Sequence, residues 1–129
     1  MGPLDSSLAG SIEAPDMETL EQLQRLLLDT FASLRRDGLR ASEPVWKDSQ
    51  EARQQALGVA ELLEFTASAG SEVMAEVLGE YLSRELGRRF PTEAATVQTE
   101  DSAVTVQVLG SKLAIRSSAP DAGVGRTYS

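Results

Sequence analysis

The spacing of apolar residues changes once along this chain, and the change limits the folds that the chain can adopt. Between residues 16 and 90, apolar side chains recur in segments with the 3.6-residue period of amphipathic helices, and from residue 95 they alternate with polar ones, as in half-exposed strands. We therefore expect an α+β domain in which two or three N-terminal helices pack against a small C-terminal antiparallel β-hairpin or three-stranded meander. A lone hairpin is marginally stable in water, so its apolar face must rest on the helices.

The first helix is predicted over residues 16–38. Asp16 is placed to cap its N-terminus, and Gly38 can adopt the left-handed conformation that ends a helix. Its apolar residues cover an arc of roughly 180–200°, which is wider than contact with one core requires. We expect a second buried surface, most simply in a symmetric homodimer, with burial of both sides within one chain as the alternative. The expected partner-binding residues are Leu20, Leu23, Leu27, Phe31 and Leu34.

Two further helical segments are predicted before the strands. One begins at Asp48, which has a glutamate three residues on, and carries apolar or small residues around most of its circumference, as a central helix does. The other spans residues 71–90, where Ser71 can cap the N-terminus and Pro91 ends the helix. Whether residues 48–88 form one curved helix or two stays open, because an Ala-Gly-Ser sequence interrupts the pattern.

Alternating residues predict the strands. Residues 95–99 form the first, a polar turn follows at 100–102, and the second leads into a turn at Gly110–Ser111. The apolar face of the second strand and of the return strand is expected to consist of Val104, Val106, Val108, Leu113 and Ile115.

The two ends of the chain show no periodicity. Residues 1–15 and 118–129 are rich in Gly, Ser, Ala and Pro, a composition that favours disorder. We therefore expect a disordered leader, a single α+β domain over residues 16–117 and a disordered tail. A chain of 129 residues, 41% of them hydrophobic, suits one domain of this kind.

The composition removes several classes of function. The chain has no Cys and no His, which excludes disulfides, thiol nucleophiles, Ser-His-Asp triads and Cys/His zinc sites. It also lacks a Gly-rich phosphate loop, so we expect no catalysis, no cofactor and no bound metal. The net charge of -8 opposes binding to nucleic-acid phosphates, and no apolar run is long enough to cross a membrane. A cytoplasmic location is the default expectation.

Three glutamates and one tryptophan are the remaining candidate site residues. Glu72, Glu76 and Glu80 recur every four residues, which places them on one ridge of the helix predicted over 71–90. Such a ridge can be a solvated face or can meet a basic partner; a cation site needs ligands that converge from several directions. Trp46 either covers one end of the helical layer or anchors a partner.

Together these features predict a non-catalytic protein-interaction module, a small acidic adaptor or assembly subunit that acts through burial of a helix face. The expected partners are other proteins, including a second copy of the chain as a homodimer; a membrane is not expected. The alternative is a winged-helix-like DNA-binding regulator, with helix 71–90 and hairpin 103–117, because the expected order of elements resembles that of winged-helix proteins. An acidic helix is poorly suited to phosphate contacts, so nucleic acid is the less favoured partner.

Overall fold

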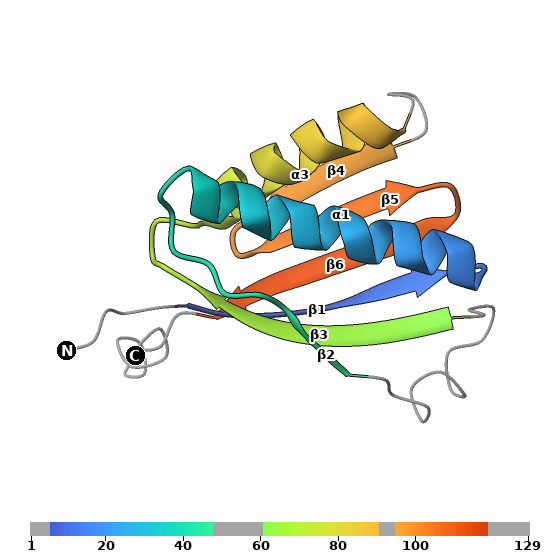
Figure 1. Cartoon of the computed structure of the whole chain (residues 1–129), viewed down its shortest axis with the longest axis horizontal. Coiled ribbons are helices and arrows are strands. Elements are labelled where there is room, and N and C mark those ends of the chain that lie inside the picture. The colour runs from blue at the N-terminus through green and yellow to red at the C-terminus, as the bar shows by residue number, and fades with distance from the viewer. Residues whose placement is uncertain (1–5, 48–60, 91–94, 119–129) are drawn as a thin grey trace.

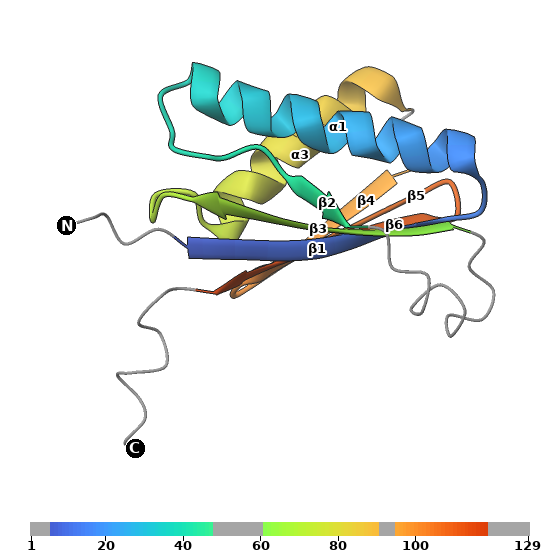
Figure 2. The same cartoon turned by 60° about the horizontal axis from the view of Figure 1, so that its bottom comes forward.

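The computed structural model describes residues 6–47, 61–90 and 95–118. In these ranges all six strands join into one antiparallel sheet, in the order β2-β3-β1-β6-β5-β4. Both helices lie on the same face of the sheet (Figures 1 and 2). The elements, in chain order, are β1 (Ser6–Ala14), α1 (Met17–Arg36), β2 (Val45–Lys47), β3 (Glu61–Ala69), α3 (Ala75–Arg89), β4 (Ala95–Glu100), β5 (Ala103–Val108) and β6 (Ser111–Ser118).

The predicted fold class is wrong. The sequence predicts a helical N-terminal layer with a small C-terminal meander, whereas strands dominate the described residues and the sheet begins at the N-terminus. The meander is present as β4, β5 and β6, but it is one half of a larger sheet. The winged-helix arrangement is absent for the same reason. Its supposed wing, β5–β6, lies inside the sheet with β4 on one side and β1 on the other.

The segment expected to be a disordered leader contains the central strand. β1 pairs with β3 along one edge and with β6 along the other. Its inner face carries Leu8, Ile12 and Ala14, all buried, with Gly10 between the first two. Gly10 lies opposite Phe65 of β3, and a Cβ at residue 10 would collide with the Phe65 ring. The aromatic ring thus fills the space that the missing side chain leaves, which hides the period of two from a sequence pattern.

The segment expected to form the second part of the central helix is strand β3. Leu63 and Phe65 face the helices, and Glu64 between them faces the opposite side. Adjacent apolar residues in this segment satisfy a helical period as well as a strand period, and long-range pairing with β1 decides between them. The predicted cap at Asp48 and the first part of that helix lie outside the described residues.

The first helix agrees with its prediction. The Asp16 side chain accepts a hydrogen bond from the Thr19 backbone amide, with 2.7 Å between Oδ1 and N. Gly38 has φ +89°, and the Leu39 amide donates to the Leu34 carbonyl at 2.9 Å, which is the bond that characterises a Schellman ending. Both ends of α1 are therefore set by local chemistry.

Two other boundaries differ from prediction. α3 begins at Ala75 rather than at the predicted cap Ser71, and its N-cap residue, Met74, makes no capping side-chain hydrogen bond. The β5–β6 turn is Leu109–Gly110, with φ angles of 53° and 77°, one residue earlier than expected. Positive φ at both central residues is the type I′ turn that suits the twist of a hairpin.

The contact between Gly10 and Phe65 gives the first prediction. Gly10→Ala lowers the free energy of unfolding by about 1–3 kcal/mol, because the new methyl group overlaps the Phe65 ring and the backbone carbonyl of Ala114. Gly87→Ala is the matched control. Apart from the backbone of α3 itself, no atom of the described residues lies within 4 Å of a Cβ at residue 87, so this variant gains about 0.5–1 kcal/mol of helix propensity. Urea unfolding followed by circular dichroism measures both, and equal stability of the two variants contradicts the prediction.

The backbone conformation of Leu109 gives the second prediction. An L-residue with a branched or bulky side chain is strained at positive φ, and Asn tolerates that region far better. Leu109 is 53% exposed, so little packing is lost on substitution. Leu109→Asn raises the free energy of unfolding by about 0.5–1 kcal/mol. Leu109→Val, with a β-branched side chain at the same angle, lowers it; a Val variant as stable as the Asn variant would show that the turn carries no strain.

Candidate protein-interaction site

The five apolar residues expected to bind a partner lie in the core of one chain. Leu20 is 5% exposed, and Leu23, Leu27, Phe31 and Leu34 are fully buried. α1 crosses the sheet with α3 beside it (Figure 1), so the sheet and α3 together cover most of the wide apolar arc, while Met17 and Leu28 stay exposed. The five residues predicted to form a homodimer interface are therefore buried within one chain, which was the alternative.

Glu72 does not belong to a helical ridge. It precedes α3, and its carboxylate accepts hydrogen bonds from the backbone amide and the guanidinium of Arg40, at 3.0 and 3.2 Å. Gly70 makes room for this carboxylate, since a Cβ there would lie 2.5 Å from both Glu72 oxygens. The Gly70 amide in turn donates to the Arg40 carbonyl at 2.9 Å. These bonds join the loop after α1 to the connection between β3 and α3.

The Arg40 hydrogen bonds lower the pKa of Glu72 from 4.5 to about 2. A carboxyl with a lower pKa in the folded state than in the unfolded state stabilises the fold above pH 4.5, and this contribution disappears as the pH falls toward 2. Glu72→Gln therefore destabilises the protein at pH 7, and the difference from wild type shrinks between pH 4.5 and pH 2. Urea unfolding of both proteins across this range measures the difference. A difference that is independent of pH shows that the carboxylate charge contributes nothing.

The other two predicted glutamates line a groove between α3 and the edge strand β4. Glu76 and Glu80 stand on α3 with the short residues Gly79 and Ser83 and with Arg84. Val97 and Thr99 of β4 form the opposite side. Short and acidic side chains therefore line the helix side of the groove, and β-branched side chains line the strand side.

Gly79 sets how closely α3 approaches β4. A Cβ at this position would lie 2.8 Å from the Thr99 hydroxyl oxygen, so the helix backbone rests almost directly on that side chain. Farther along the helix, the Arg84 guanidinium lies 5.0 Å from the centre of the Tyr81 ring, and the Tyr81 hydroxyl donates to Asp37. That hydrogen bond raises the pKa of Tyr81. These contacts hold α3 and its outward side chains in place beside the strand.

β4 is an open edge within the described part of the sheet. It pairs only with β5 there, starting from Glu100 and Ala103 at the turn. Residue pairs along two antiparallel strands are alternately hydrogen-bonded and non-hydrogen-bonded, and the pair that flanks a two-residue turn, here Glu100 and Ala103, is hydrogen-bonded. The pairs formed by Thr99 and by Val97 are therefore non-hydrogen-bonded. The backbone groups of Val97 and Thr99 therefore point to the open side. β4 contains no Pro and no Lys, the residues that commonly protect an edge from pairing with another chain.

Trp46 lies in strand β2 rather than in a loop. Its ring packs on Phe65, with 5.4 Å between ring centroids and 54° between planes, and it is half-buried at the border of the core. It therefore covers apolar surface at the sheet edge opposite to β4, and it is far from the groove in the strand order.

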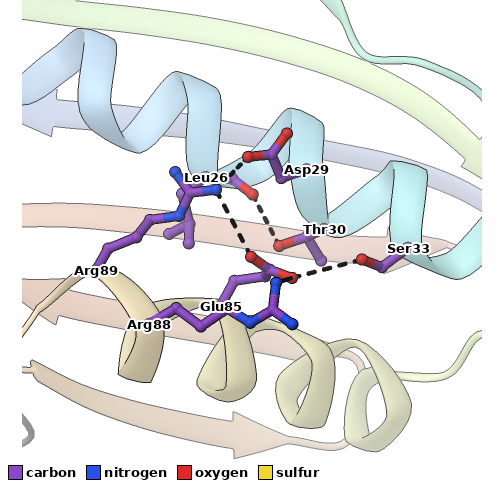
Figure 3. Close-up of polar contacts among 7 residues, drawn as sticks. All are labelled: Leu26, Asp29, Thr30, Ser33, Glu85, Arg88 and Arg89. Atoms are coloured by element: carbon purple, nitrogen blue, oxygen red, sulfur yellow. Dashed lines mark hydrogen bonds and ion pairs between the residues drawn. The ribbon is translucent and has the colours of Figure 1, made fainter.

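A buried carboxylate joins the two helices (Figure 3). Glu85 of α3 is 4% exposed and accepts a hydrogen bond from the Ser33 hydroxyl of α1 at 3.4 Å. Arg88 and Arg89 lie 3.8 and 3.6 Å from its oxygens, and Arg89 also binds Asp29 of α1. Glu85 and Arg89, four residues apart on α3, thus form an ion pair. A buried charge must be paired, and these partners account for Glu85 as a residue that sets the packing of α3 on α1.

The described ranges contain no group of three or more Asp, Glu, Cys or His residues that could hold a metal ion. Among the two described helices, neither is long and apolar enough to cross a membrane.

Sequence patterns identify two of the seven described residues that line the groove, Glu76 and Glu80. They miss the other residues on α3 and both residues on β4: Gly79, Ser83, Arg84, Val97 and Thr99. Gly79 and Ser83, four residues apart on the polar side of the predicted helix, could have indicated the groove, because short residues permit close approach by another backbone. The predicted meander places both of its outer strands at an edge, and the pairing of β1 with β6 leaves β4 as the open one in the described sheet.

Comparison with protein-family models, with curated proteins and with solved structures finds no match to this chain. A functional proposal therefore rests on the geometry of the chain itself.

Proposed function

We propose that this chain is a non-catalytic protein-interaction module that binds an extended segment of a partner as an additional strand beside β4. The observation that carries the proposal is the unprotected edge of β4 next to the groove under α3. Unpaired backbone groups along an edge supply the affinity in strand addition, and pockets beside the edge supply the specificity. The β4 edge supplies the unpaired backbone groups, and the adjoining groove supplies the pocket.

The size and chemistry of the groove support binding rather than catalysis. Among the described residues, its ionisable side chains are two carboxylates and a guanidinium on one exposed helix face. Acid–base catalysis works best in a place that excludes water, and an open groove does not provide one. The adaptor function expected from the sequence is thus retained, and its surface moves from α1 to α3 and β4.

The test uses peptides selected from a random library displayed on phage, with the full chain as the target. We expect the selected peptides to bind wild type and Thr99→Val equally, and to bind Thr99→Pro at least about tenfold more weakly, because proline removes the outward amide and cannot pair on that side. The Thr99→Val variant keeps the amide and the β-branched shape, so it is the matched control.

If Thr99→Pro does not fold, nuclear magnetic resonance on the wild-type protein tests the proposed binding site instead. Peptide binding to wild type should slow hydrogen exchange of the Val97 and Thr99 amides and shift the resonances of residues 76–84. Peptides that select well but perturb the outer sheet face, or no selected peptide at all, would overturn the proposal.

A further inference from the structure

We infer that the occupant of the groove is a lone extended segment with basic side chains at alternate positions, rather than the edge of a folded sheet or a second copy of this chain. The inference rests on the proposed function and specifies its ligand. It follows from two properties of the groove: the space that α3 leaves above the edge of the sheet, and the sign of the charge on that helix.

The position of α3 limits what can pair with β4. α3 packs over β4, with Gly79 against Thr99, and follows that strand in Figure 1. Neighbouring strands lie about 4.8 Å apart, whereas packed helices need about 8–10 Å between their axes. In a symmetric pair of β4 strands, the second copy would bring its own α3 into the space that this α3 occupies. A segment with no helix of its own on that face meets no such obstacle.

The charge of the helix face selects the side chains of the guest. Alternate residues of an added strand point toward the helix layer, where Glu76 and Glu80 stand. Among the described residues that line the groove, Arg84 is the one cation, and its guanidinium already lies over the Tyr81 ring. Ser83 is short and leaves room for a long side chain to reach the carboxylates. Lys or Arg at every second guest position therefore complements the groove.

The net charge of the chain argues in the same direction. At -8, two copies repel each other, and a basic segment is attracted. A second copy would also place its own Glu100 and Asp101 at the paired edges. The chemistry of the surface thus favours a basic partner over self-association.

The experiment uses three synthetic peptides of one length with Val and Thr on one face and Lys, Gln or Glu at the alternate positions. We expect wild type to bind the Lys peptide roughly tenfold more tightly than the Glu peptide at low salt, with Gln between them, since each exposed ion pair contributes modestly. The preference should weaken as salt rises. Isothermal titration calorimetry measures the three dissociation constants.

A pair of double variants assigns the preference to the groove. Glu76→Lys with Glu80→Lys should reverse the order of the Lys and Glu peptides. Glu18→Lys with Glu21→Lys changes the net charge equally on exposed residues of α1, outside the groove, and should leave the order unchanged. If both double variants reverse the order, overall charge rather than the groove selects the peptide, and the inference fails.

The outcomes separate the inference from the proposed function. Three peptides that bind equally, and whose binding is lost in Thr99→Pro, overturn the basic specificity and leave strand addition standing. A wild-type dimer in analytical ultracentrifugation that becomes monomeric in Thr99→Pro shows that the occupant is a second copy, which also overturns the inference. Peptide binding that is insensitive to Thr99→Pro removes the proposed function as well.

Discussion

The pairing of β1 along both of its edges holds this fold together. β1 connects β2 and β3 on one side with β6, β5 and β4 on the other, so without it the sheet divides into two pieces that share no hydrogen bonds. Gly10, in the middle of β1, allows the Phe65 ring to lie across the strand and reach the core. α1 begins three residues after β1 ends, and its apolar face therefore lies on the sheet that β1 has brought together.

Features that depend on neighbouring residues were predictable, and features that depend on distant ones were not. Asp16 and Gly38 mark the two ends of α1 through hydrogen bonds between residues at most five apart in sequence. Residue type and spacing were therefore enough to predict both ends. The alternating valines of β5 and the polar turn before them were equally local. By contrast, Leu8 and Ile12 give too short a pattern to identify β1, and β3 is a strand because β1 pairs with it.

The same distinction applies to the groove. The four-residue spacing of Glu76 and Glu80 places both on one helix face from sequence alone. Glu72 departs from that series because a tertiary contact with Arg40, from a loop 32 residues away, holds its carboxylate. The edge position of β4 is a property of topology. The predicted meander has an edge at each of its outer strands, and it is the pairing of β1 with β6, which no local pattern indicates, that leaves the β4 edge open in the described sheet.

The pairing of the first strand with the last has a consequence for how the protein is made. β1 lies beside β6, with Ser7 opposite Ser118, so the interior of the sheet closes only when the final strand is available. During synthesis, β1 and β3 leave the exit tunnel with one edge of β1 unpaired until β6 has followed. Contacts between residues so distant in sequence slow folding, and open strand edges during that delay favour aggregation. The edge of β1 that faces β6 is therefore the place where a partly synthesised chain is most exposed to pairing with another chain.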